Sequence, residues 1–259
     1  MFRLILTDLD GTLLRSDKTV SSATCSVLKR CRAAGYLLGI ATARILPNAL
    51  RVLEGIEPDL IISSGGALIT HCGRELYRCA FSVEETKAML SAALSLQCEI
   101  TVDTVSEHYW NYTFDPSLLT PDWCRSVYSD FRDFNEEALK ICVQISDEGT
   151  AERIAASVPD CDYAKFSDVD FYKFTKKGAT KEKAAQIAAK SFEIAPEELI
   201  AFGDDMVDLE MLRFCGRGIA MENAIGAVKE IADAVTDTND CDGVAKYLEE
   251  MLLTEKAGV

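Results

Sequence analysis

The chain has 259 residues, 48% of them hydrophobic and 27% charged, which is the balance of a globular protein with an apolar core. Its formal net charge of −15 at pH 7 disfavours nucleic acids and anionic membranes as partners. No run reaches the roughly 18 apolar residues of a membrane helix, and the apolar start at 2–6 meets Asp8 too early for a signal peptide.

The first part of the chain alternates buried strands with helices. The predicted order is strand 2–6, helix 22–34, strand 36–41, helix 48–53 and strand 60–63. Gly35 supplies a stop signal for the first helix. Strands that alternate with helices in this way are typical of a parallel, doubly wound sheet.

The pattern changes near Ser82. Ser82 and Glu85 have the spacing of a capping box, which predicts a helix to about Leu96. The elements expected after it are strands 99–102 and 109–114, helix 123–131, strand 140–145, helix 150–157, and strands 162–166 and 171–174. Successive strands suit a mixed or antiparallel sheet, so we interpret 82–175 as an inserted α+β domain.

The parallel pattern resumes after residue 175. The expected elements are helix 181–191 with Thr180 as its N-cap, strand 199–202, helix 207–214, strand 218–220, a helix capped by Asn223 that runs to 232, a short strand at Val235, and helix 243–252. The predicted fold is therefore α/β, with a doubly wound parallel-sheet (Rossmann-like) core formed by 1–81 and 176–259.

Cysteine usage indicates a reducing compartment. The sequence has ten cysteines but no Cys-x-x-Cys pair, and its two histidines are too few and too far apart to suggest zinc. We therefore expect reduced, mostly packed thiols in a cytoplasmic protein.

Acidic residues follow two of the predicted strands. Asp8 and Asp10 stand two apart just before Gly11, at the carboxyl end of the first strand, where parallel sheets bind ligands. Two carboxylates this close repel each other, and Mg²⁺ would remove that cost. Asp204 and Asp208 would face the same point if strand 199–202 neighbours the first. The alternatives are an Asx turn at Asp8 and a helix first-turn acid at Asp208.

Three other side chains can bind phosphate. Thr42 and Arg44 follow strand 36–41, although Thr42 could instead cap the next helix and Arg44 could be solvated. Lys181 lies in a first helical turn, where a cation opposes the dipole unless an anion binds nearby; otherwise it belongs to a solvated face. Together with the acids, these residues indicate phosphoryl transfer through a carboxylate nucleophile and a metal ion.

Four segments resemble the motifs of the haloacid dehalogenase (HAD) superfamily in order and spacing, and the chain looks like a Cof-type, subfamily IIB phosphatase. The matching segments are Asp8–Thr12, Thr42 with Arg44, Lys177–Lys181, Gly203–Asp208, and the tail at 220–224, 232–233 and 242–245. The resemblance covers the whole chain and implies that 82–175 is a cap domain, which would close over the site and choose the substrate.

The resemblance also implies a role for each site residue. Asp8 would be the nucleophile that forms an aspartyl-phosphate, and Asp10 would protonate the leaving group and then activate water. The other implied roles are a Mg²⁺ site made by Asp8, the backbone carbonyl of Asp10 and Asp204, support of that site by Asp208, and phosphate binding by Thr42, Lys181 and Arg44. The implied activity is hydrolysis of a small phosphorylated metabolite, such as a sugar or cofactor phosphate.

Two positions depart from the family pattern. Val207 and Gly65 stand where the family usually has asparagines. A phosphomutase or phosphotransferase that uses the same intermediate is an alternative, and so is a receiver-like phosphate-binding protein. Tyr109, Trp110 and Tyr112 could line the cleft, but alternating aromatics in a strand more often pack.

Overall fold

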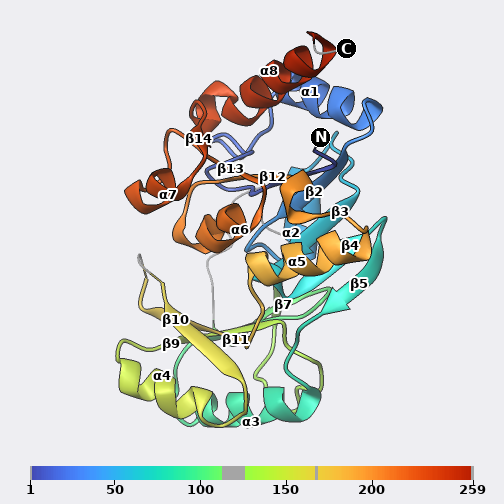
Figure 1. Cartoon of the computed structure of the whole chain (residues 1–259). Helices are drawn as coiled ribbons and strands as arrows, with labels where there is room; N and C mark the ends of the chain where they lie inside the picture. The colour runs from blue at the N-terminus through green and yellow to red at the C-terminus, as the bar shows by residue number, and fades with distance from the viewer. Residues whose placement is uncertain (1, 113–125, 167–168, 258–259) are drawn as a thin grey trace. The chain divides into compact units, whose positions relative to one another are not determined.

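The computed structural model describes residues 2–112, 126–166 and 169–257 (Figure 1). The chain divides into two compact units: Met1–Ala43, Val52–Tyr77 and Thr180–Val259 form the first, and Arg44–Arg51 with Arg78–Ala179 form the second. The expected insert, 82–175, falls inside the second unit, and its role as a cap domain stays a prediction. Residues 44–51, expected in the core domain, group with the second unit.

An eight-stranded sheet organises the first unit. Its order is β14 (Ala234–Val235), β13 (Arg217–Ala220), β12 (Leu199–Gly203), β1 (Leu4–Thr7), β2 (Leu37–Ala41), β3 (Leu60–Ser63), β4 (Leu68–His71) and β5 (Arg74–Arg78). The strands from β14 to β3 run parallel, as the α/β, doubly wound prediction requires, and β4 pairs with β3 antiparallel.

Sequence reasoning missed β4 and β5. The two strands meet at Cys72 and Gly73, which both have positive φ, the backbone of a tight hairpin turn. β5 at the sheet edge is mostly exposed and polar, so no apolar run marks it.

Helices cover both faces of this sheet. The helices are α1 (Ser22–Ala33), α5 (Lys181–Ser191), α6 (Leu209–Phe214), α7 (Gly226–Ile231) and α8 (Gly243–Ala257). The first and last of them, α1 and α8, lie side by side, whereas α5 and α6 pack together against the sheet (Figure 1). Arg30 on α1 pairs with Glu249 on α8 at 2.7 Å. None of the helices in the described ranges is long and apolar enough to cross a membrane.

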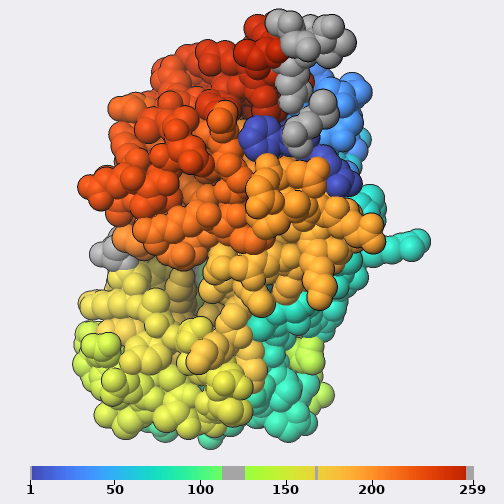
Figure 2. All heavy atoms as spheres, in the orientation of Figure 1, coloured from blue at the N-terminus to red at the C-terminus, as the bar shows by residue number. Residues whose placement is uncertain are grey.

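The N-terminus is tied to the chain that precedes β12. Arg3 donates a hydrogen bond to the carbonyl oxygen of Glu193 at 3.0 Å and pairs with Glu198 at 3.5 Å. In Figure 2, dark blue atoms from the N-terminal end of the chain lie next to orange ones. The four residues of β1 that follow are fully buried, so β1 lies at the centre of the core.

The second unit has its own sheet and core. Its order is β10 (Cys161–Lys165), β11 (Phe171–Lys176), β9 (Lys140–Gln144), β6 (Ile100–Asp103), β7 (His108–Trp110) and β8 (Ser126–Tyr128). Pairing is antiparallel except between β7 and β8. Helices α3 (Val83–Leu94) and α4 (Glu148–Ala155) contribute Leu90 and Ile154 to its apolar core. A third helix, α2 (Leu46–Val52), falls almost wholly in residues assigned to this unit.

Two predicted elements of the second unit need correction. The helix expected at 123–131 is wrong where the structure describes it, because Ser126–Tyr128 forms β8. Val127 and Tyr128 favour a pleated strand, and β7 supplies the hydrogen-bonding partner. The strand expected at 109–114 is β7, His108–Trp110, and residues 113 and 114 lie outside the described ranges.

Candidate active site

The carboxyl ends of β12 and β1 meet in the first unit. The two strands pair in parallel from Leu4 with Leu199 to Thr7 with Phe202, and the Asp8 amide donates to the Phe202 carbonyl oxygen at 3.1 Å. The condition stated in the sequence analysis, that strand 199–202 neighbours the first strand, is therefore confirmed. As a result, Asp8 and the acids that follow β12 share one edge of the sheet.

Three carboxylates and one ammonium group gather at this edge. Carboxylate oxygens of Asp8, Asp204 and Asp208 lie within 4.8 Å of one another. The Lys181 Nζ lies 2.5 Å from Asp8 Oδ1 and 2.6 Å from Asp208 Oδ1. Lys181 is 2% exposed although it opens α5, because these two carboxylates compensate the charge that the helix dipole opposes.

Asp208 is bound by protein donors on both oxygens. Its Oδ1 accepts from Lys181, and its Oδ2 accepts from the backbone amides of Asp204 and Asp205 at 3.2 Å each. A Cβ at Gly203 would lie 2.5 Å from the Asp208 Cβ, so only glycine fits there. Asp208 therefore orients Lys181 and the Asp204 backbone.

Asp204 contacts the turn that follows β1. The Thr12 hydroxyl donates to Asp204 Oδ1 at 2.7 Å. Gly11 has φ +81°, and a Cβ there would lie 2.3 Å from Asp204 Oδ2. Sequence reasoning quoted Thr12 within a motif but gave it no role; a hydroxyl two residues after Asp10 was the available signal.

Burial governs the electrostatics of this site. Burial raises the pKa of Asp8, and Lys181 acts against that rise. Burial also raises the pKa of Asp204 to about 6, with the Thr12 hydrogen bond opposing. Burial disfavours the charge of Lys181, but Asp8 and Asp208 outweigh it and raise the lysine pKa. The buried carboxylates thus lack full compensation for their charge.

The donor set fits a hard divalent cation. With all groups ionised, three carboxylates and one ammonium leave two uncompensated negative charges. Oxygen ligands at this density suit Mg²⁺, and no cysteine or histidine belongs to the described cluster. A divalent cation would offset the burial that raises the pKa of Asp204.

The Asp10 side chain lies apart from the carboxylate cluster among the described residues. Its Oδ1 pairs with the Lys18 Nζ at 2.8 Å, and the Asp10 side chain is 39% exposed. Lys18 has φ +65° in a turn where the Arg15 amide donates to the Thr19 carbonyl oxygen and the Lys18 amide donates to the Arg15 carbonyl oxygen, each at 2.9 Å. Sequence reasoning missed Lys18, because the turn that returns it to Asp10 has no strong local signature.

Thr42 sits at the end of β2, beside the first turn of α5. The Gly65 amide donates to the Thr42 carbonyl oxygen at 2.9 Å, and a Cβ at Gly66 would lie 2.2 Å from the Thr180 carbonyl oxygen. The 3-10 turn η1 (Ser64–Gly66) therefore joins the strand end to the helix that carries Lys181. Gly65 has φ +71° with open space around its missing side chain.

The remaining candidates lie in the second unit. Arg44 is half-buried there, and its phosphate role stays a prediction. Tyr109 packs its ring on Phe134 at 5.1 Å and donates its hydroxyl to Glu136 at 2.6 Å. Trp110 and Tyr112 lie 5.5 Å apart, ring to ring. Tyr109 thus has the packing role that the sequence analysis favoured over lining of a cleft.

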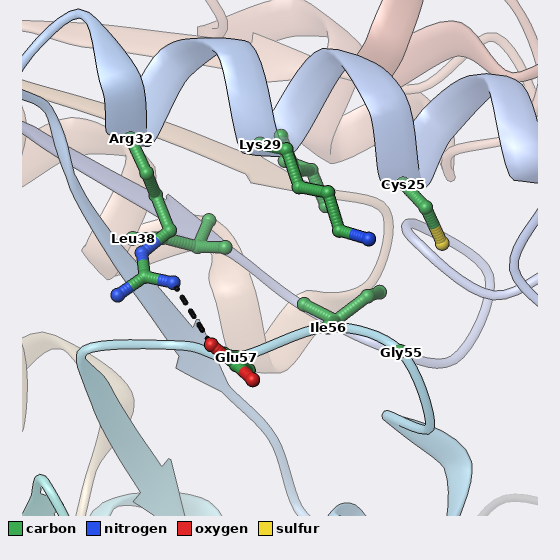
Figure 3. A pocket seen from close by; sticks show the side chains of 8 residues that line it. Cys25, Lys29, Arg32, Leu38, Gly55, Ile56 and Glu57 are labelled. Atoms are coloured by element: carbon green, nitrogen blue, oxygen red, sulfur yellow. Dashed lines mark ion pairs between the residues drawn. The ribbon is translucent and has the colours of Figure 1, made fainter.

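A pocket of about 200 Å³ lies between α1 and the chain before β3 (Figure 3). Lys29 on α1 stands over Ile56, whereas Arg32 on the same helix extends toward Glu57 and pairs with it at 3.6 Å. The pocket shares no residue with the carboxylate cluster and is smaller than typical ligand sites of 300 Å³ or more.

Comparison with known proteins places this geometry in a family. A family model described as haloacid dehalogenase-like hydrolase matches residues 5–248. The 5-amino-6-(5-phospho-D-ribitylamino)uracil phosphatase YitU of Bacillus subtilis is 29% identical over 95% of this chain and 96% of its own. The HMP-PP phosphatase of Yersinia pseudotuberculosis is 27% identical over 97% of this chain and 96% of its own.

Solved structures agree with these sequence matches. A haloacid dehalogenase-like hydrolase from Bacteroides thetaiotaomicron has a TM-score of 0.84 at 25% identity, covering 97% of this chain and 100% of that one. A HAD subclass IIB sugar phosphatase has a TM-score of 0.79 at 26% identity, covering 96% of this chain and 98% of that one. The chain therefore belongs to the haloacid dehalogenase-like hydrolase family, and its resemblance to the Cof-type, subfamily IIB phosphatases is confirmed.

Proposed function

We propose that this protein is a Mg²⁺-dependent phosphatase that hydrolyses a small phosphorylated metabolite through an aspartyl-phosphate on Asp8. The carrying observation is the cluster in which Lys181 bridges Asp8 and Asp208 beside Asp204. Asp8, Asp204 and the Asp10 carbonyl oxygen would hold the metal. The bound cation would neutralise charge on the phosphate oxygens.

In the first step, an Asp8 oxygen forms a bond to phosphorus while the ester bond to the leaving oxygen breaks. The Asp10 carboxyl gives its proton to that leaving oxygen, and the alcohol departs. Lys181 binds Asp8 Oδ1 at 2.5 Å, which holds the carboxylate in one orientation. Thr42 and Lys181 donate to the phosphoryl oxygens, with Arg44 as a further phosphate contact.

In the second step, water attacks the aspartyl-phosphate and gives its proton to the Asp10 carboxylate. The bond between phosphorus and the Asp8 oxygen breaks, which releases phosphate and restores both carboxyl groups. Asp10 can serve both steps because its side chain is partly exposed and lies outside the buried cluster. The second unit, as a cap, would exclude bulk water and select the substrate.

The substrates for which the relatives are named support the substrate class. They include a phosphoribityl-aminouracil, HMP-PP and a sugar phosphate, all small phosphorylated metabolites. Because these substrates differ in the group that carries the phosphate, we infer that residues outside the carboxylate cluster select the substrate. A cytoplasmic location is part of the proposal, because the nine cysteines in the described ranges form no disulfide bonds, which suits a reducing compartment.

A panel of phosphorylated metabolites tests this function, assayed for inorganic phosphate with Mg²⁺ and with chelator. Asp8→Asn should abolish phosphate release, since an amide is neither a nucleophile nor an anionic ligand. Asp130→Asn, an exposed aspartate in the second unit, is the matched control and should keep full activity. Full activity in Asp8→Asn would show that Asp8 is not the nucleophile and would refute the mechanism. Product formation only with an added hydroxyl acceptor would instead identify a phosphotransferase.

A further inference from the structure

Asn223 does not have the role that its sequence position indicates. The expected N-cap of a helix to 232 is wrong, because α7 begins at Gly226 after Ile225. The Asn223 Nδ2 instead donates to the Gly11 carbonyl oxygen at 2.7 Å, and its Oδ1 accepts from the Asn239 amide at 3.0 Å. Asn223 therefore joins the turn after β1 to the C-terminal part of the chain.

The peptide that Asn223 binds is the one that touches Asp204. Gly11 passes so close that a Cβ would lie 2.3 Å from Asp204 Oδ2, and the next residue, Thr12, donates its hydroxyl to Asp204 Oδ1. Fixing the carbonyl oxygen of Gly11 fixes the plane of the peptide between Gly11 and Thr12. That plane sets where the Thr12 Cα stands, and with it the start of the side chain that carries the hydroxyl.

A second contact of the same segment reaches Asp204 itself. The Ile225 amide donates to the Asp204 carbonyl oxygen at 3.0 Å. Residues 223–225 thus hold the turn after β1 through a side chain and the turn after β12 through the backbone. Asn239, whose amide donates to the Asn223 side chain, is itself held in place. It is 8% exposed, and its Nδ2 donates to the Leu14 carbonyl oxygen at 2.9 Å.

We propose that Asn223 is a positioning residue for the metal site, which holds the Gly11–Thr12 peptide against Asp204 through its Nδ2. This inference rests on the proposed function, because the ligands it positions are those of the proposed Mg²⁺ site. Side chains that orient metal ligands typically change affinity by 10- to 100-fold when they are removed.

The test measures metal binding directly. Mn²⁺, which takes the same oxygen ligands, is titrated into the full-length protein, and the free ion is followed by electron paramagnetic resonance. We expect Asn223→Ala to raise the Mn²⁺ Kd roughly tenfold while the melting temperature in chelator stays near that of the wild type. Asn135→Ala removes an exposed asparagine that accepts from Lys87 in the second unit, and its Kd should stay within about twofold.

Asn239→Ala separates positioning from folding. It keeps the backbone amide that Asn223 accepts from but loses the bond to the Leu14 carbonyl oxygen. We expect it to lower the melting temperature more than Asn223→Ala, because Asn239 is buried, and to change the Kd less. An unchanged Kd in Asn223→Ala would overturn the inference. So would a loss of Mn²⁺ affinity that parallels the loss of melting temperature in both variants. Phosphatase activity of the wild type would then leave the proposed function standing, whereas a wild type that binds no Mn²⁺ would overturn both.

Discussion

At the scale of single residues, Lys181 is a buried ammonium group that compensates the charge of two buried carboxylates. It is almost fully buried between Asp8 and Asp208, and removal of one partner from such a group leaves uncompensated buried charge. The ammonium is also the fixed cation nearest the proposed nucleophile. One side chain thus serves both the stability of the site and its chemistry.

Lys181→Met should therefore lose both stability and activity. We expect a cost of about 3 kcal/mol in the free energy of unfolding, measured by urea titration in chelator, and a fall in kcat of about 10²–10³-fold. Lys183→Met is the control, since Lys183 lies on the exposed side of the same helix turn and should change neither quantity by more than a small amount. A Lys181→Met protein with wild-type turnover would remove Lys181 from the mechanism.

Asp10→Asn should separate catalysis from stability. Asp10 is partly exposed and its ion pair with Lys18 is exposed as well, so the free energy of unfolding should change by less than about 1 kcal/mol. Turnover should fall by about 10²–10⁴-fold, because an amide cannot pass a proton to the leaving oxygen. Steady-state phosphate release and urea unfolding measure the two effects. Normal turnover in this variant would mean that another group is the acid and base.

At the scale of elements, the helix caps predicted at Ser82 and Thr180 are confirmed, whereas the cap expected at Asn223 is wrong. Ser82 caps α3 through both bonds of the expected box: its Oγ accepts from the Glu85 amide at 3.2 Å, and its amide donates to Glu85 Oε2 at 2.9 Å. Thr180 caps α5 through a single bond, in which its Oγ1 accepts from the Lys183 amide at 3.1 Å. Capping depends on residues three apart, so a local sequence is sufficient to specify it.

Ser82→Ala should destabilise the second unit by about 1 kcal/mol, the usual cost of losing an N-cap. Ser95→Ala is the matched control at the other end of α3, where the hydroxyl only donates back to the Ala92 carbonyl oxygen. Urea unfolding followed by tryptophan fluorescence measures both variants. Equal effects of the two substitutions would argue against the capping box.

The sheet of the second unit contains a cluster of three titratable side chains around the buried carboxylate of Asp103. The carboxylate of Asp103 on β6 lies 2.5 Å from His108 Nδ1 on β7 and 2.7 Å from the Lys140 Nζ on β9. Burial opposes ionisation of Asp103, but Lys140 and His108 outweigh it and lower its pKa to about 2. Such a group stabilises the fold above its unfolded pKa of about 3.9 and loses that contribution as pH falls toward 2.

We therefore expect the stability difference between wild type and Asp103→Asn to shrink by roughly 2 kcal/mol between pH 5 and pH 2. Urea midpoints across this range measure it, and the difference cancels the titration of other carboxylates. Above about pH 5 the difference should be flat. A difference that stays constant down to pH 2 would mean that the Asp103 pKa is not depressed.

At the scale of the whole molecule, the two units provide separate readouts. Both tryptophans of the sequence, Trp110 and Trp123, fall in the range of the second unit, whereas the carboxylate cluster belongs to the first. A ligand that binds only the folded state stabilises the unit that holds it. Fluorescence thus follows the second unit, and circular dichroism follows both.

Mg²⁺ at about ten times its Kd should stabilise the first unit by about 1.4 kcal/mol. The circular dichroism transition should move to higher temperature, whereas the fluorescence transition should stay in place. Asp204→Asn should abolish the shift, because it removes one proposed ligand. If both transitions moved together, the two units would unfold as one cooperative body.

The sequence alone determined the strand and helix pattern of the parallel core and the positions of Asp8, Asp204 and Lys181 after strands or at a helix start. Apolar runs, caps and motif spacing are local properties, so they can be read without the fold. Failures were local too: β5 lacks an apolar run, and Val127 and Tyr128 were assigned to a helix instead of β8. At β5 the partner strand β4 decides the structure, and at β8 the partner strand β7 acts together with the strand preference of Val127 and Tyr128.

Only the tertiary structure decided which residues meet. The order β12-β1-β2 brings the ends of strands nearly two hundred residues apart to one edge, where Lys181 bridges Asp8 and Asp208. The Asn223 side chain binds the Gly11 carbonyl oxygen across 212 positions. No local pattern encodes a hydrogen bond over that separation, because its partner is chosen by strand order and packing. The sequence thus specified the groups for the chemistry, and the fold specified their contacts.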